Sequence, residues 1–265
     1  MIAVVRPPGD AFERAISAVP ERWPGDRIDP ARARSQHAGY CALVQQAGVR
    51  LLPLPASEEH PDACFTQDSA VVLSAAGRVC ALIARFGVAA RQGEQADIER
   101  ALAPVLPPGA DLQRVEAPAT LEGGDVLVFA DRIAVGRSRR TNDAGIAALA
   151  AAAGPLGFAV EAVEIPSWAL HLSTAATIVG DDLALGDASV LAQEPFRDLD
   201  KVVVPDDDRL ACNVWSAGRF VIAAGEHPIH SELEQRGYAV HATDLSEFNR
   251  ADGSPTCLSM LVRQP

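Results

Sequence analysis

The chain has 265 residues, of which 48% are hydrophobic, and it carries a formal net charge of −12. That length and apolar content allow a sizeable core without disulfide or metal support. The negative charge argues against nucleic acid and anionic membranes as partners, and no apolar run approaches the length of a membrane span.

Strands and helices are expected to alternate along the whole chain. Short apolar runs bounded by turn residues predict strands, singly or in pairs around a turn, at residues 1–5, 49–54, 69–73, 79–84, 125–136, 174–186, 212–225 and 238–245. Helical periodicity predicts helices at residues 31–48, 95–106, 142–157 and 230–237. Gly48 is a typical residue to end the first of these helices.

The cysteines bear on the cellular compartment. The chain has five, scattered and without a C-x-x-C pair, which disfavours a disulfide framework and a zinc or iron–sulfur site. No positively charged start followed by an apolar segment resembles a signal peptide. We therefore expect a cytoplasmic protein.

Strand, turn, strand, helix and strand recur as an internal repeat of roughly 40 to 55 residues. The copies open with CFTQD, LEGGD, LHLST and ACNVW, and a fifth opening, TCLSM, is followed by a single strand. Residues 1–54 supply the strand, helix and strand that this fifth copy lacks. An array whose two ends join is a ring, so we expect a single α/β domain of five units spanning residues 1–265.

Each copy has one polar residue near the start of its first strand, in chain order Asp68, Glu122, His171, Asn213 and Cys257. Rotation about a common axis would bring these five residues into one pocket. The alternative is that each satisfies only its own turn, and a single cysteine is more often buried than reactive. The chemistry of the set decides between these interpretations.

A cysteine, a histidine and two carboxylates form a coherent catalytic set. A thiol must lose its proton to become a nucleophile, and a histidine can serve first as general acid and later as base. Carboxylates that stay ionised hold a cation, and the planar fork of a guanidinium matches them through paired hydrogen bonds. The set therefore points to a small cationic guanidino substrate.

Five segments, PDACFTQD, LEGGDVL, RSRRTN, ALHLS and DGSPTCLS, lie in the order found in dimethylarginine dimethylaminohydrolases. The chain resembles this family over nearly its whole length. The family belongs to the guanidino-modifying superfamily, together with arginine deiminase and the amidinotransferases. The resemblance implies a five-bladed α/β propeller that hydrolyses Nω-methylated arginine to citrulline and methylamine or dimethylamine.

The resemblance also assigns roles to residues that match the family motifs. It implies Cys257 as the nucleophile that forms a covalent thiouronium intermediate, and His171 as the general acid and base. Glu122 would orient His171, and Asp68 would bind the guanidinium.

Further matches concern the amino-acid end of the substrate. Arg91 and Arg140 match arginines that hold its carboxylate, and Asp62 matches an acid near its α-amino group. The role of Asp125, in the GGD turn, is left open between tying the turn and binding the guanidinium.

Two positions depart from the family pattern. Gln67 stands where relatives have glutamate before the aspartate, and Ser173 stands where relatives have lysine and arginine deiminases have aspartate. Without that second carboxylate the site is poorly equipped to bind an unsubstituted guanidinium on both sides, which leaves room for N-substituents.

The expected activity therefore requires neither a metal nor an organic cofactor, and we expect a monomer or a homodimer. Deimination or amidino transfer on another guanidino compound is an alternative within the same superfamily. A non-catalytic protein that binds a cationic amino acid is an alternative of another class, although it would not need Cys257 and His171 together.

Overall fold

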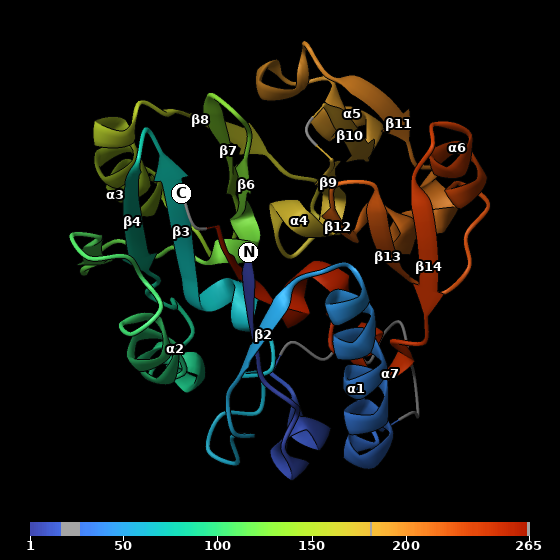
Figure 1. Cartoon of the computed structure of the whole chain (residues 1–265), viewed down its shortest axis with the longest axis horizontal. Helices are drawn as coiled ribbons and strands as arrows, with labels where there is room; N and C mark the ends of the chain where they lie inside the picture. The colour runs from blue at the N-terminus through green and yellow to red at the C-terminus, as the bar shows by residue number, and fades with distance from the viewer. Residues whose placement is uncertain (17–26, 181, 264–265) are drawn as a thin grey trace.

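The computed structural model describes residues 1–16, 27–180 and 182–263. Five three-stranded sheets surround a common centre (Figure 1). In order along the ring the sheets are β3 (Ala70–Ala75), β4 (Arg78–Ile83) and β5 (Asp111–Arg114); β6 (Val126–Val128), β7 (Arg132–Arg137) and β8 (Ala159–Glu164); β9 (Ala176–Val179), β10 (Leu183–Gly186) and β11 (Asp200–Val203); β12 (Val214–Ala217), β13 (Phe220–Ala224) and β14 (Ala239–Thr243); and β15 (Met260–Val262), β1 (Ile2–Val5) and β2 (Arg50–Pro53). The expected five-bladed α/β propeller is confirmed.

All five sheets share one topology. The first strand pairs antiparallel with the second, and the second pairs parallel with the third. A helix connects the second strand to the third, since parallel neighbours need a crossover. These connecting helices are α1 (Pro30–Gln46), α2 (Gln95–Leu102), α3 (Asp143–Ala153), α5 (Ala188–Leu191) and α6 (His230–Gln235), while α4 (Leu172–Ala175) and α7 (Ser246–Asn249) precede first strands.

The ring closes where the fifth sheet joins the two ends of the chain. β15 pairs with β1 from Ile2 opposite Val262 to Val4 opposite Met260, and β1 pairs with β2. Residues 1–54 therefore complete the fifth unit, as the repeat predicts. The label for the N-terminus, where β1 begins, lies near the centre of Figure 1.

Local sequence explains the limits of the helices. Asp29 caps α1 by accepting hydrogen bonds from Ala31 N and Arg32 N, and Gly48, at a φ of 81°, follows its end. The other expected helices are shorter than predicted: α2 ends at Leu102 rather than residue 106, and α3 gives way after Ala153 to the 3₁₀ turn η5 (Gly154–Leu156).

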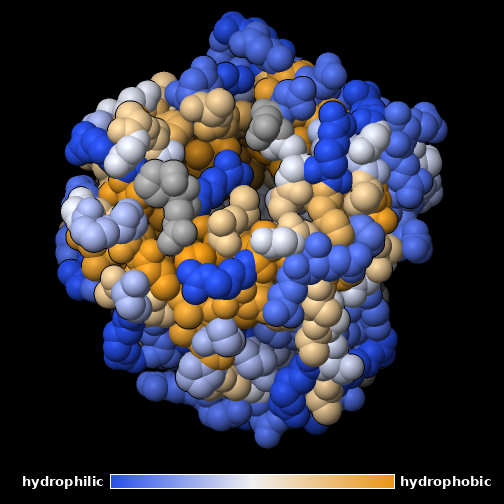
Figure 2. All heavy atoms as spheres, in the orientation of Figure 1, coloured by the Kyte–Doolittle hydropathy of each residue, from blue (hydrophilic) through white to orange (hydrophobic). Residues whose placement is uncertain are grey.

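Hydrophobic side chains fill the spaces between neighbouring sheets. One cluster joins β3 and β4 to β6, β7 and α3 through residues that include Leu73, Leu82 and Ile133. Figure 2 shows hydrophobic residues toward the middle of one face and hydrophilic residues along much of its rim. None of the described helices is long and apolar enough to cross a membrane.

Candidate active site

A short helical turn precedes the first strand of every sheet and places one polar residue near the centre of the ring. Three of the turns are η2 (Thr66–Ser69), η4 (Gly123–Asp125) and η8 (Pro255–Leu258), and the others are α4 and η7 (Asp206–Cys212). η2 packs against both η4 and η8, and α4 packs against both η4 and η7. The residues that these turns carry are all buried: Asp68, Glu122, His171, Asn213 and Cys257.

Glu122 and His171 form a buried ion pair. Their atoms Oε2 and Nε2 are 2.9 Å apart. Burial alone would lower the pKa of His171, but the anions of Asp68, Asp125 and Glu122 outweigh it and raise this pKa from 6.5 to about 9. Burial opposes ionisation of Glu122 as well, yet His171 and two arginines lower its pKa to about 2. At neutral pH the pair is therefore an imidazolium and a carboxylate.

Two glycines allow the turns to approach this closely. A Cβ on Gly123 would lie 2.1 Å from the carbonyl oxygen of Gln67. A Cβ on Gly124 would lie 2.7 Å from Asp68 Oδ1 and 2.9 Å from His171 Cγ. The GG pair of the LEGGD segment is therefore required by the space between η2, η4 and α4.

Asp125 stabilises the turn that carries His171 through hydrogen bonds. It is fully buried, and its Oδ1 accepts a 3.0 Å hydrogen bond from Leu172 N, the first residue of α4. Its Oδ2 accepts a 2.6 Å bond from Ser138 Oγ. Burial raises the pKa of Asp125. Of the two roles left open by the sequence, these contacts favour the structural one.

The guanidinium of Arg91 lies among three carboxylates. Arg91 NH1 is 2.9 Å from Asp68 Oδ2 and 3.4 Å from Glu122 Oε2, while NH2 is 2.8 Å from Glu94. The side chain is 1% exposed and its Cζ lies 4.4 Å from the centre of the Phe86 ring. The sequence suggests Arg91 as a ligand of the substrate carboxylate, whereas the structure places it beside the predicted guanidinium ligand.

Glu94 was not identified from the sequence. It is buried and binds Arg91 through the Nε and NH2 atoms of the guanidinium. The sequence carries one signal for this pair. Arg91 and Glu94 lie three residues apart in the segment RQGE, and residues at this spacing can meet within a helical turn.

Arg140 and Asp62, the other two residues predicted for the amino-acid end of the substrate, have different surroundings. Arg140 is 8% exposed, and its NH1 is 3.4 Å from Glu122 Oε1. Asp62 is fully buried, and its Oδ1 accepts a 2.8 Å hydrogen bond from Ile16 N.

Cys257 is a neutral thiol in this environment. Burial raises its pKa, and the nearby carboxylate of Asp68 raises it further, to about 12. Its backbone N–H donates to Ser254 O at 3.0 Å, which holds the η8 turn. A cation bound beside the sulfur would favour the thiolate.

Among the buried polar atoms that have no hydrogen-bond partner within the described residues, three belong to predicted site residues: Asp68 Oδ1, Gln67 Oε1 and Ser173 Oγ. An unpartnered buried acceptor costs about 1–3 kcal/mol, which a ligand with N–H groups would recover. Asp68 thus binds Arg91 with one oxygen and keeps the other oxygen available for a donor.

Three residues of the site have the spacing of metal ligands. Asp68, Glu122 and His171 offer ligand atoms that lie within 4.8 Å of one another. Arg91 already brings a positive charge against Asp68 and Glu122. This charge would repel a divalent ion, and an imidazolium at His171, whose pKa is raised to about 9, has no lone pair to offer one.

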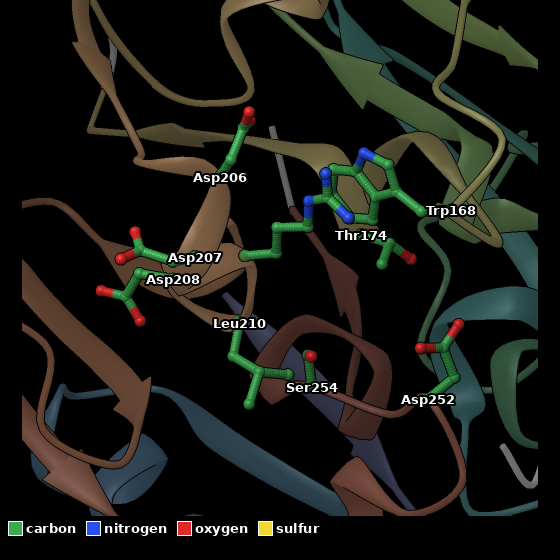
Figure 3. A pocket seen from close by; sticks show the side chains of 9 residues that line it. Trp168, Thr174, Asp206, Asp207, Asp208, Leu210, Asp252 and Ser254 are labelled. Atoms are coloured by element: carbon green, nitrogen blue, oxygen red, sulfur yellow. The ribbon is translucent and has the colours of Figure 1, made fainter. Parts of the chain in front are cut away.

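A pocket of about 250 Å³ lies beside the turns that carry His171 and Cys257 (Figure 3). Thr174 of α4 and Ser254, which precedes η8, belong to its wall. The remaining lining residues are Trp168, Asp206, Asp207, Asp208, Arg209, Leu210 and Asp252. Four of the lining residues are aspartates and one is an arginine, so the pocket favours a cation.

Comparisons with known proteins point to one family. The family model described as "N,N dimethylarginine dimethylhydrolase, eukaryotic" matches residues 21–209. A Pseudomonas aeruginosa protein named N(G),N(G)-dimethylarginine dimethylaminohydrolase is 30% identical over 258 residues, which cover 94% of this chain and 99% of the relative. A Streptomyces coelicolor protein of the same name is 33% identical over 267 residues, covering 99% and 97% of the two chains.

Solved structures show the same fold. A mutant Pseudomonas aeruginosa enzyme of this name, complexed with citrulline, superposes with a TM-score of 0.89 at 26% identity and covers 98% of both chains. The N-terminal domain of ArgZ, covalently bound to a reaction intermediate, gives a TM-score of 0.84 at 20% identity over 100% of this chain and 98% of that domain. This second likeness concerns the fold alone.

Proposed function

The chain belongs to the dimethylarginine dimethylaminohydrolase family, and on that basis we propose that it hydrolyses Nω-methylated arginine to citrulline and methylamine or dimethylamine. The observation that carries the proposal is the unpartnered Asp68 Oδ1, buried beside the Glu122–His171 ion pair in the same ring of turns as Cys257. A buried acceptor without a donor, next to an acid and a thiol, suits a guanidinium.

Binding the substrate would activate the nucleophile. The guanidinium donates to Asp68 Oδ1, and its positive charge near Cys257 opposes the two influences, burial and the Asp68 anion, that raise the pKa of the thiol. The thiol proton leaves to solvent, and the thiolate attacks the central guanidinium carbon. Asp68 therefore serves both to bind the cation and to make thiol ionisation depend on its arrival.

His171 would then act twice. Because its Nε2 binds Glu122, Nδ1 is the nitrogen that can give a proton to the departing methylamine or dimethylamine. The carbon–nitrogen bond breaks and leaves a thiouronium on Cys257. The neutral imidazole next takes a proton from water, and the hydroxide adds to the thiouronium carbon. The carbon–sulfur bond breaks, the hydroxyl proton passes to the departing Cys257 sulfur, and citrulline and the free thiol result.

We propose Arg140 as the ligand of the substrate carboxylate, because it is the more exposed of the two predicted arginines. Arg91 adds positive charge from a buried position and holds Asp68. Asp62 is proposed to favour the α-ammonium through its charge. Gln67 and Ser173 are proposed to lie at the substituted end of the guanidinium, where the buried oxygen that each has without a partner in the described part of the chain accepts from the remaining N–H groups.

We further propose one catalytic domain of residues 1–265 that acts in the cytoplasm as a monomer or homodimer. Support for a reducing compartment comes from the cysteines, all of which are free: Cys41, Cys64, Cys80, Cys212 and Cys257. Size-exclusion chromatography with light scattering tests the oligomeric state.

A panel of substrates tests the activity. Purified protein is incubated with arginine, Nω-monomethylarginine and asymmetric and symmetric dimethylarginine, and both citrulline and the released amine are measured. We expect the methylated forms to exceed arginine by about tenfold or more in kcat/KM, because methyl groups reduce the number of donors that need partners and gain apolar contact.

The Cys257→Ser variant is the matched control. It should fold as the parent does but lose turnover, since a neutral hydroxyl is a much weaker nucleophile than a thiolate. Faster turnover of free arginine than of its methylated forms would replace the proposal with deimination. Binding of methylarginine without turnover of any derivative by the parent enzyme would favour the non-catalytic alternative.

A further inference from the structure

Asn213 occupies the position in the fourth sheet that corresponds to Asp68, Glu122, His171 and Cys257 in the other four. It follows η7 directly and precedes β12. The side chain is 2% exposed. It bears no charge, so its contribution to the site must come through hydrogen bonding.

Its amide connects the two turns that carry the reacting groups. Asn213 Nδ2 donates to Ser173 O at 2.7 Å and to Thr256 Oγ1 at 2.8 Å. Asn213 Oδ1 accepts from Thr256 N at 3.1 Å. Ser173 lies two residues after His171, and Thr256 directly precedes Cys257.

The bond to Thr256 also orients a hydroxyl group. Because Thr256 Oγ1 accepts the hydrogen bond from Asn213, its own proton is free to point elsewhere. Burial is the largest influence on the pKa of Cys257 and raises it, whereas a hydrogen bond from the Thr256 side chain lowers it. Asn213 thus holds the side chain that directly precedes Cys257 and that lowers the pKa of its thiol.

We propose that Asn213 is a positioning residue that fixes the Cys257 turn relative to the His171 turn and directs the Thr256 hydroxyl toward the Cys257 sulfur. The inference rests on the proposed function for its catalytic consequence. Each turn is only four residues long. The turns precede β9 and β15, which belong to different sheets, so no strand pairing joins them. A misplacement of about 1 Å between reacting groups can cost about a hundredfold in rate.

Two readouts test the proposal. Asn213→Ala should lower kcat for methylated arginine by about a hundredfold while KM changes by less than about threefold, because within the described residues Asn213 hydrogen-bonds neither Asp68 nor Arg140, the proposed ligands of the guanidinium and the carboxylate. The pH profile of Cys257 alkylation by iodoacetamide should move to higher pH, with the rate on a Cys257→Ser background subtracted. Gln193→Ala is the matched control, since the Gln193 amide also donates two hydrogen bonds and accepts one, at the surface of the third sheet.

Thr256→Val gives an independent test if Asn213→Ala does not fold. It removes the hydroxyl with little change in shape and should move the alkylation profile in the same direction. Thr256→Ser, which keeps the hydroxyl, should restore the parent profile. In a double variant, Asn213→Ala should add no further shift to Thr256→Val.

Several results would overturn the proposal. These are an unchanged kcat in Asn213→Ala, a loss confined to KM, an alkylation profile that neither substitution moves, or shifts that simply add in the double variant. The alkylation readout needs no substrate. It therefore remains decisive for Asn213 if the parent enzyme turns over no methylated arginine, in which case only the proposed function fails.

Discussion

Replacing Asp68 by asparagine should affect substrate turnover and thiol reactivity in opposite directions. Asp68→Asn keeps the shape of the side chain but removes the anion that faces the substrate guanidinium. Breaking one side of a buried charge pair costs about 3–5 kcal/mol, which corresponds to a fall in kcat/KM of about a hundredfold to several thousandfold. Arg91 keeps its contacts with Glu94 and Glu122, at 2.8 and 3.4 Å, so the fold should survive.

In the enzyme without substrate, the same substitution should make the Cys257 thiol more reactive. Asp68 raises the pKa of Cys257, so its removal lowers this pKa and increases the thiolate fraction near neutral pH. Iodoacetamide is uncharged and should therefore alkylate Cys257 faster in Asp68→Asn than in the parent, measured by mass on the tryptic peptide. This mass readout separates Cys257 from the half-buried Cys41.

The matched control is Asp131→Asn, which removes an exposed aspartate paired with Arg132. It should change neither kcat/KM nor the rate of Cys257 alkylation by more than about twofold, since exposed ion pairs contribute little. Slower alkylation in Asp68→Asn, or a fall in kcat/KM of less than about tenfold, would refute the reasoning. Asp68 would then be only a turn residue.

Three further predictions concern the glycine turn, selectivity and pH. Gly124→Ala should reduce kcat strongly because the new Cβ would lie 2.9 Å from His171 Cγ, whereas Gly154→Ala, with open space around it, should leave steady-state kinetics unchanged. Ser173→Asp should narrow or invert the preference for methylated over free arginine in kcat/KM, since it supplies a second carboxylate, and an unchanged ratio would separate Ser173 from selectivity. Because the pKa of His171 is raised to about 9, its acid function should be present at neutral pH and kcat should fall as pH rises through about 9. Glu122→Gln should move that fall to lower pH, and a kcat–pH profile that does not move would show that this pair does not set the acid.

The sequence predicted the ring because its repeat is carried by strands with a strong apolar pattern. The first two strands of each sheet are mostly buried, as in β4 with only its first residue exposed. The third strands β5, β8 and β11 were not identified individually, because they lie on the outside and carry mixed polar residues, as in DLQR of β5. α5, with four residues, is too short for helical periodicity to reveal.

The convergence of the five turn residues also followed from the repeat, whereas their partners did not. Asp68, Glu122 and His171 offer atoms within 4.8 Å of one another because equivalent positions meet at the centre of a ring. The placement of Arg91 on Asp68 depends on how the chain before α2 folds back over η2, which no local pattern encodes. Carboxylates that attract a substrate guanidinium attract an arginine of the chain for the same reason.

The closure of the ring has a consequence for when the enzyme can become active. β15 begins three residues after Cys257, and it takes its place by pairing with β1 from the other end of the chain. During synthesis, Asp68, Glu122 and His171 leave the ribosome long before Cys257 does. Pairing between such distant segments carries a loop-closure cost that must be met before the contacts form. We therefore expect Cys257 to join His171 only when β15 pairs with β1, so that turnover would report a closed ring.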